Sequence, residues 1–403
     1  MQKEVFCFDN AKNMVITCLI ALIVFGSVNM YSASFIYGTQ EMGSAYHFLL
    51  RYAIGVVASI ISLAIVRKVG YKTFMQDNWL FILGCLAFLS LIFVQFLGVE
   101  VNSARRWLSL GFIRVQPSEF VKLFIIIYCS AKFGALINKG KRVNMFYRPG
   151  ATCLGVAVLL GLMVAVEPDA GTGIFIFGLA FCLAIIGGLR IAQIAIIAML
   201  SLGVVVILLL LAPYRLARII SWWHPWDDPT GAGYQMVQSF IAIGSGKLTG
   251  MEWGSGISKF HFLPELHTDF AFAVFCQENG FIGALFLILV FLALAYALWV
   301  IVRRTTDSQG ALLVSGVIFL VVGQSILNMA MVCGVLPISG VPLSFISYGG
   351  SNMVVATTAL GLALSVYDEQ SKKEERQALI AKAVAESPED RRRQWQIIEG
   401  GKK

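Results

Sequence analysis

The sequence predicts an all-α polytopic membrane protein with about ten transmembrane helices. Of its 403 residues, 58% are hydrophobic and 13% are charged, whereas soluble globular proteins have about 45–50% apolar and about 25% charged residues. The excess of apolar side chains must therefore face lipid. The apolar runs long enough to span a membrane lie near 14–36, 46–66, 79–98, 119–137, 151–167, 171–189, 191–212, 270–302, 311–335 and 350–366.

The short basic loops predict the orientation of the chain. Basic residues follow the second span (Arg67, Lys68), the fourth span (139–148) and the eighth span (Arg303, Arg304), and the positive-inside rule places such loops in the cytoplasm. Both termini then lie in the cytoplasm, as tails 1–13 and 367–403 on a membrane domain over 14–366. The longest polar interruption, 213–269, becomes a large extracytoplasmic loop between helices seven and eight. The first apolar run is too long for a signal-peptide core, so we expect it to be retained.

Several classes of function are disfavoured. The net charge of +8 is explained by the loops, so it does not indicate nucleic acid binding. The eight cysteines show no CxxC spacing and are expected to be small hydrophobic residues of helices. Four histidines without an HExxH motif argue against zinc, and Gly244-Ser-Gly-Lys247 lacks the first glycine of a phosphate-binding loop. The polar tail from Asp368 is expected to be disordered or a frayed helix, with Arg391-Arg-Arg393 near anionic membrane lipid.

The outer loops carry basic residues, although the positive-inside rule favours such residues on the cytoplasmic side. Arg105, Arg106 and Arg114 lie between spans three and four, and the large loop adds Arg215 and Arg218. Guanidinium groups bind phosphate or pyrophosphate through paired hydrogen bonds, so an anionic ligand is one explanation. Pairing with loop carboxylates such as Glu100, Asp227 and Asp228 is the other, and the sequence leaves both open.

Two further polar features occur at the outer ends of spans. Glu119 and Lys122 share a helix face after Pro117. Burying ionisable groups inside a span costs free energy, which favours a functional role for them over a self-contained ion pair. The turn Glu167-Pro-Asp-Ala-Gly-Thr172 carries two carboxylates that are either functional or helix caps. Both alternatives stay open for this turn.

The large loop ends in Leu263-Pro-Glu-Leu-His-Thr-Asp269, directly before a long apolar run. Asp269 is either a cap of the eighth span or a functional carboxylate, with Glu265 and His267 beside it. Glu278 lies about two turns into that span and is a functional candidate because of its burial cost. The tryptophans at 222, 223 and 226 are typical of interfacial anchors.

The ninth and tenth spans are joined by a segment patterned with proline and glycine, 336–351. Irregular backbone at membrane depth is tolerated only where protein or a cavity covers it, so we expect this segment to line the same cavity as the large loop. Gln324 and Asn328 precede it on one helix face.

These motifs, taken in order, resemble the SEDS family (shape, elongation, division and sporulation), the FtsW and RodA peptidoglycan glycosyltransferases. The resemblance covers nearly the whole chain, and 215–229 is more similar to the division branch, FtsW. Many members have leucine at Ala170, Glu-Glu-Leu-Gly at Gln277-Glu-Asn-Gly280, and a second glycine at Lys247. The matching motifs are Arg106-Trp107, Val115-Gln-Pro-Ser-Glu119, Glu167-Pro-Asp-Ala-Gly-Thr172, Gly233-Tyr-Gln, Gln238-Ser, Leu263-Pro-Glu-Leu-His-Thr-Asp-Phe270 and Pro342-Leu-Ser-Phe-Ile-Ser-Tyr-Gly-Gly-Ser351.

The resemblance implies an enzyme of the bacterial inner membrane that polymerises lipid II at its outer face, for septal wall synthesis. Asp269 matches the family's key carboxylate and would be the general base, while cations would stabilise the departing pyrophosphate. Arg106 and Arg114 are the first candidates for that role, with Lys122 also possible and Arg215 and Arg218 second choices. The other residues expected to contact substrate are Trp107, Glu119, Gln238, Glu265, His267, Glu278 and Ser347.

The resemblance also implies partners: a class B penicillin-binding protein transpeptidase and other divisome proteins. A divalent cation such as magnesium or manganese stays open, because the chain has no dedicated metal motif. Two other functions compete with the transferase. A lipid II flippase needs ionisable residues along a path through the whole bilayer, whereas here they cluster toward the outer half. A non-catalytic division scaffold has no need for Asp269.

Overall fold

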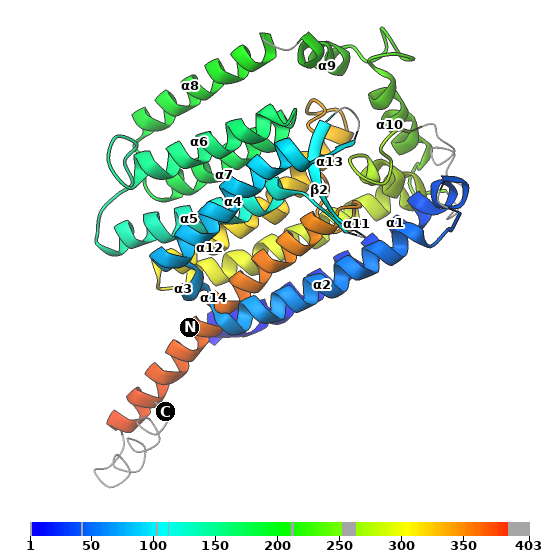
Figure 1. Cartoon of the computed structure of the whole chain (residues 1–403). Helices are drawn as coiled ribbons and strands as arrows, with labels where there is room; N and C mark the ends of the chain where they lie inside the picture. The colour runs from blue at the N-terminus through cyan, green and yellow to red at the C-terminus, as the bar shows by residue number, and fades with distance from the viewer. Residues whose placement is uncertain are drawn as a thin grey trace.

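The computed structural model describes residues 2–41, 43–101, 104–111, 113–210, 213–251 and 263–385, and it is a bundle of long helices (Figure 1). In this part of the chain, seven helices are long and apolar enough to cross a membrane, and three shorter apolar helices accompany them. The predicted all-α polytopic membrane fold is therefore confirmed. The helices of the bundle are α1 (Gln2–Glu41), α2 (His47–Val69), α4 (Asp77–Leu97), α5 (Pro117–Asn138), α6 (Gly150–Val166), α7 (Ala170–Ile186), α8 (Ile191–Leu210), α11 (Ala271–Arg304), α12 (Ser308–Ile318) with η2 (Phe319–Gly323) and α13 (Gln324–Val332), and α14 (Gly350–Ala385). The three shorter ones are α6, α7 and α8.

The helices pack in neighbouring pairs around a buried core. α2 packs along α14, α1 along α11, α5 along α12, and α6 along α7. Small residues allow close approach: a Cβ on Gly134 of α5 would lie 2.5 Å from the Cα of Gln309 in α12. α8 lies at the periphery of the bundle (Figure 1), with outward side chains such as Met199 and Leu202 exposed.

The end of the bundle at which α1 begins and α14 leaves is here called the basic end, because Arg67, Lys68 and Lys72 lie there with the short α3 (Tyr71–Phe74). α14 does not stop at the membrane boundary but continues as a helix to Ala385, and the tail beyond it, with Arg391–Arg393, lies outside the described residues. Arg67 pairs with Asp368 at 2.5 Å, and Lys72 pairs with Glu369. The N-terminal tail is likewise helical from Gln2.

The opposite end, here called the site end, carries the irregular segments. A three-stranded antiparallel sheet follows α4, with β1 (Val99–Val101), β2 (Ala104–Leu110) and β3 (Ile113–Val115). These strands were not predicted, because they are too short to show an alternating pattern in the sequence. The large loop contributes α9 (Pro213–Trp223) and α10 (Tyr234–Ser245), and Figure 1 shows them along the same side of the bundle as β2.

α11 is broken at Gly280, whose backbone adopts φ 64° and ψ −167°. Beyond the break, the N–H of Phe281 donates to the carbonyl of Lys247 at 2.9 Å, and that of Ile282 to Leu248 at 3.1 Å. The first amides of a helix have no partner within the helix, so the large loop supplies the missing acceptors. Lys247 itself has φ 48°, a conformation that favours glycine, at the position where many SEDS members have one.

The break separates two kinds of helix. Every residue from 271 to 278 is buried, so this first piece is enclosed by protein on all its faces. From Phe281 onward, outward residues such as Phe281 (62% exposed) alternate with buried ones such as Leu287, which is the pattern of a lipid-facing span. Asp269 therefore precedes a helix that is held by protein alone.

We expect Gly280→Ala to destabilise the protein by about 1–3 kcal/mol, because an alanine would have to hold a strained backbone conformation. Its Cβ would also lie 2.2 Å from the backbone nitrogen of Gly250. The measurement is the apparent melting temperature of the purified protein in detergent. Gly178→Ala is the matched control, since a Cβ there meets nothing within 4 Å; equal melting temperatures for the two variants would contradict the assignment.

Candidate functional site

Asp269 is fixed at the site end by bonds to its backbone. The side-chain amide of Asn328, in α13, donates to the Asp269 carbonyl at 2.9 Å and to the Val341 carbonyl at 2.8 Å. The Asp269 carboxylate lies against Gly340, where a Cβ would be 3.7 Å from Oδ2. Asn328 therefore joins the end of the large loop to the irregular segment 333–349, and both segments face the carboxylate.

The residues just before Asp269 form a tight turn. The Thr268 hydroxyl donates to Oε2 of Glu265 at 2.6 Å, and Glu265 itself has φ 52°. The carbonyl of His267 accepts from the N–H of Tyr348 at 2.7 Å, and the His267 ring packs against Phe48 with centroids 5.2 Å apart. Glu265 and His267 thus shape the turn that presents Asp269.

Asp269 does not cap α11. The N-cap position is Phe270, without a side-chain capping bond, and within the described ranges no hydrogen bond reaches the Asp269 carboxylate. The side chain is partly exposed. Of the two alternatives left by the sequence, the structure thus removes the cap, which leaves a half-buried carboxylate without a hydrogen bond among the described residues.

A second group of carboxylates lies near Asp269, in the turn between α6 and α7. Arg106, on β2, donates from Nε to the Glu167 carbonyl at 3.1 Å and from Nη2 to the Pro168 carbonyl. Asp169 caps α7 by accepting the N–H of Thr172 at 3.2 Å. Glu167 is buried, and its Oε1 has no hydrogen-bond partner among the described residues. The capping alternative is therefore correct for Asp169 and does not apply to Glu167.

Burial and neighbouring carboxylates raise the pKa values of two of these acids. Burial first, and then the nearby charges of Glu265 and Asp169, together raise the pKa of Asp269 to about 7 against the opposing effect of Arg106 and Arg218. Burial, with a smaller contribution from Asp169, raises the pKa of Glu167 to about 8. A carboxylate with a pKa near 7 suits a general base at neutral pH.

Glu119 and Lys122 form a buried network behind the site. The Lys122 ammonium is fully buried and donates to Glu119 Oε1 and to Gln324 Oε1, both at 2.7 Å. Asn352 donates to the second oxygen of Glu119 at 2.9 Å, and the amide of Gln324 donates to the Pro342 carbonyl at 3.0 Å. The pair therefore holds the segment 333–349 from inside the bundle, where a bound substrate could reach Lys122 only if the network opened.

The remaining predicted residues are spread around the site end. Arg218 is exposed on α9 and close enough to lower the pKa of Asp269, whereas the side chain of Arg215 lies outside the description. Arg114 is exposed on β3, and Trp107 is half-buried on β2, opposite Val99. Gln238 is half-buried on α10.

Two predicted residues have structural partners. The Ser347 hydroxyl accepts the N–H of Leu343 at 3.0 Å and so closes a turn. Glu278 is buried at the end of the enclosed helix and accepts from the Ser32 hydroxyl of α1 at 2.7 Å. Their predicted substrate contacts stay predictions.

Four polar residues of the site were noticed in the sequence, but no substrate contact was predicted for them: Asn328, Gln324, Glu167 and Asp169. The signal was available: each is a polar side chain within or directly beside an apolar run, where burial without a partner is expensive. Gly340 gave no such signal, because its role depends on a neighbour far away in the sequence. Among the described residues, no group of three or more His, Cys, Asp or Glu side chains is arranged to hold a metal ion.

Comparisons with known proteins find related sequences along most of the chain. A family model named for FtsW, RodA and SpoVE and described as "Cell cycle protein" matches residues 12–372. The chain is 34% identical over 353 residues to "Stage V sporulation protein E" of Bacillus subtilis, covering 88% of this chain and 95% of that protein. It is also 34% identical over 371 residues to "Probable peptidoglycan glycosyltransferase FtsW" of Coxiella burnetii, covering 91% and 98%.

The fold is also found among solved structures. A chain from the structure described as "Structural coordination of polymerization and crosslinking by a peptidoglycan synthase complex" superposes with a TM-score of 0.72 at 21% identity, over 88% of this chain and 97% of that one. At this identity the likeness concerns the fold alone.

We expect Lys122→Met to lower stability by about 3–5 kcal/mol, because it leaves the Glu119 carboxylate buried without its ammonium partner. The double variant Glu119→Gln/Lys122→Met removes both charges and should recover a large part of that loss. Melting temperatures of the two single variants, the double variant and the wild type measure the coupling. If the double variant loses the sum of the single losses, the two side chains do not act as a pair.

Proposed function

The chain belongs to the FtsW, RodA and SpoVE family of cell cycle proteins, and from this premise we infer that it is a peptidoglycan glycosyltransferase in which Asp269 is the general base. It polymerises lipid II into glycan strands. The resemblance to the division branch favours septal wall synthesis as its role.

The observation that carries the assignment is the state of Asp269. Asp269 is half-buried, its carboxylate has no hydrogen bond within the described ranges, and its pKa is raised to about 7, mainly by burial. Its backbone, by contrast, is held by Asn328 and followed by the enclosed helix 271–278. Such a fixed carboxylate with an accessible, basic oxygen is what proton abstraction requires.

The reaction needs one proton acceptor. The 4-hydroxyl of the acceptor sugar attacks C1 of the lipid-linked donor, the new C1–O bond forms, and the bond from C1 to the pyrophosphate oxygen breaks. The hydroxyl proton passes to Asp269, and undecaprenyl pyrophosphate leaves as an anion without needing a proton. One carboxylate is therefore sufficient, unlike the pair that glycosidases use.

Cations near Asp269 have different roles in this proposal. Arg218 is exposed and interacts electrostatically with Asp269, so it is the described cation best placed to stabilise the departing pyrophosphate. Arg106 donates hydrogen bonds from Nε and Nη2 to the carbonyls of Glu167 and Pro168 in the turn. It therefore acts mainly by fixing that turn and by lowering the pKa values of the surrounding acids.

The orientation and the partners follow from the same premise. Lipid II polymerisation belongs to the outer face of the bacterial cytoplasmic membrane, so the site end would face outward and the basic end the cytoplasm, as the positive-inside rule favours. One structural neighbour is part of a peptidoglycan synthase complex. We therefore expect this chain to work with a class B penicillin-binding protein transpeptidase and with other divisome proteins.

We expect Asp269→Asn to abolish polymerisation of purified lipid II by the chain with its cognate partner, by a factor of about 10² or more, because the base is lost. The variant should fold at least as well as the wild type above pH 7, since it removes a charge that burial disfavours. The measurements are the gel-resolved glycan product and the melting temperature.

Asp227→Asn is the matched control, because it makes the same substitution at an exposed carboxylate of the same loop and should leave polymerisation unchanged. A folded Asp269→Asn variant that polymerises at the wild-type rate would refute the assignment of the base. A wild-type complex that is folded yet makes no polymer would favour the flippase or the scaffold.

The rate should also depend on pH through Asp269. The base acts only when ionised, so kcat/KM should rise about tenfold per pH unit at acidic pH and level off above about pH 7. Because Arg218 lowers the pKa of Asp269, Arg218→Gln should move the acidic limb to higher pH. Initial rates between pH 5 and 9 test both statements, and a profile without an acidic limb would contradict them.

A further inference from the structure

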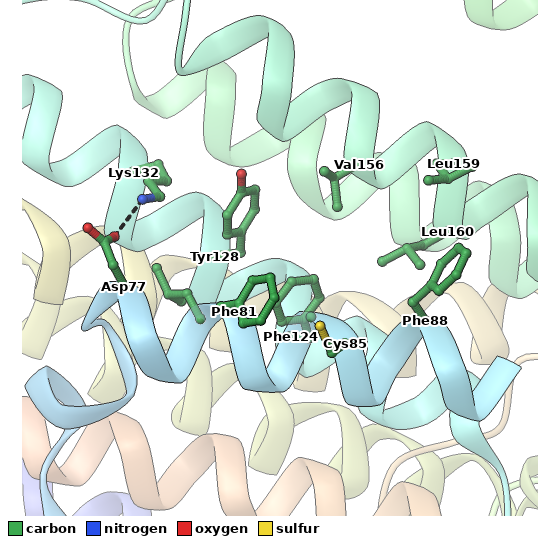
Figure 2. A pocket seen from close by; sticks show the side chains of 12 residues that line it. Asp77, Phe81, Cys85, Phe88, Phe124, Tyr128, Lys132, Val156, Leu159 and Leu160 are labelled. Carbon is green, nitrogen blue, oxygen red and sulfur yellow. Dashed lines mark hydrogen bonds and ion pairs between the residues drawn. The ribbon is translucent and has the colours of Figure 1, made fainter.

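A groove runs along the outside of the bundle between α4, α5 and α6, away from Asp269. Its volume is about 450 Å³, within the range of about 300–1,000 Å³ that is usual for ligand sites. Figure 2 shows the ion pair of Asp77 and Lys132 at one end of the groove, and mostly apolar side chains, with Tyr128 and Cys85 among them, along the rest. The groove belongs to neither the candidate site nor the network around Lys122.

The walls of the groove are apolar and open toward lipid. Phe81, on α4, is 73% exposed, and Leu159, on α6, is 51% exposed; both line the groove. Its floor is deepened by Gly84, where a Cβ would lie 3.2 Å from Phe124. A side chain larger than glycine would fill this space, so the depression between the helices depends on this residue.

One end of the groove is polar. Lys132 of α5 donates to Asp77 of α4 at 2.7 Å (Figure 2), and this is the one hydrogen bond of its ammonium group within the described residues. An ammonium group has three donors, so two stay available for another acceptor. Trp79, 40% exposed beside Asp77, is typical of the interface between membrane and water, so the ion pair lies at headgroup level.

This polar end is also the basic end of the bundle. The first turn of α4, with Asp77, follows α3, where Lys72 lies, and α5 ends at Asn138, directly before Lys139 and Lys141. Clusters of lysine and arginine beside a membrane attract anionic lipid headgroups. The electrostatic surroundings of Lys132 therefore favour a phosphate.

The length of the groove favours a lipid chain as its occupant. From Asp77 to Phe88 the groove extends for roughly 16 Å along α4, which is about half of the roughly 30 Å thickness of the hydrocarbon core of a bilayer. One acyl chain spans about one leaflet, so a lipid whose phosphate lies at Lys132 has an acyl chain of the right length to follow the apolar lining.

We propose that this groove binds an anionic glycerophospholipid of the membrane, with one acyl chain along Phe81, Cys85 and Phe88 and the phosphate on Lys132. The phosphate accepts from the free donors of the ammonium, and Asp77 competes with it for the same cation. The bound acyl chain replaces the mobile lipid that would otherwise face the gap between α4 and α6.

The proposal is tested by titrating delipidated full-length protein in detergent with phosphatidylglycerol and resolving the bound forms by native mass spectrometry. The wild type should retain a tightly bound lipid. Lys132→Gln should weaken binding roughly tenfold or more, because a charge-assisted contact is lost, whereas Asp77→Asn should not weaken it, because the competing carboxylate is gone. Lys139→Gln removes a positive charge at the same end of the bundle but outside the groove, so it controls for the general effect of losing a positive charge.

A second pair of variants tests the chain-binding part. Cys85→Trp fills the groove and should abolish the tight binding, whereas Leu89→Trp, exposed on the same helix outside the groove lining, should not. An alkyl maltoside of equal chain length should compete weakly, since it lacks the phosphate. If Lys132→Gln and Cys85→Trp both bind as the wild type does, the lipid lies elsewhere and the proposal fails.

The occupant in the native membrane is identified separately. A photoreactive phenylalanine analogue at Phe81, on the rim of the groove, should form an adduct with phospholipid on illumination. An adduct with a second protein in place of lipid would overturn the proposal in favour of a partner surface. Neither readout depends on polymerisation, so failure here leaves the assignment of Asp269 untouched.

Discussion

The irregular backbone of the site end depends on one buried cation. The Lys122 ammonium donates hydrogen bonds to Glu119 and Gln324, and the amide of Gln324 donates to the Pro342 carbonyl. Asn352 donates to the second carboxylate oxygen of Glu119. Charges in an apolar interior are stable only when every partner is present, so this network fixes the relative register of α5, α13 and α14 in a single arrangement. That arrangement places Gly340 against the Asp269 carboxylate.

The same logic explains how a non-helical segment exists among membrane helices. Each exposed carbonyl of such a segment must find a donor from the surrounding protein, and here Tyr52 donates to Phe345 at 2.6 Å while Asn328 donates to Val341 and Asp269. Phe345 and Glu265 adopt positive φ angles, which cost free energy and persist only when their surroundings determine them. The stability of the bundle thus holds a carboxylate in an environment that disfavours its ionisation.

The sequence was sufficient to predict the fold, because spans of roughly 20 apolar residues are a strong signal. The functional role of Asp269, which its position and motif predict, stays a prediction. The sequence was not sufficient to distinguish Asp169 from Asp269: both precede an apolar helix, yet one caps it and the other does not. The strands at 99–115 were missed because they have only three to seven residues each. The break at Gly280 was missed because its cause, the carbonyls of Lys247 and Leu248, comes from a distant part of the chain.

That break has a mechanical consequence. A membrane span adapts to bilayers of different thickness mainly by tilting, and a continuous rod would transmit such a tilt to whatever lies at its end. α11 has 34 residues, about 51 Å, but only the piece after Gly280 faces lipid. Because α11 is interrupted at Gly280, the lipid-facing piece and the enclosed piece before it do not form one continuous rod. A tilt of the lipid-facing piece therefore reaches Asp269 only through the contacts at the break, where the loop carbonyls of Lys247 and Leu248 hold the amides of Phe281 and Ile282.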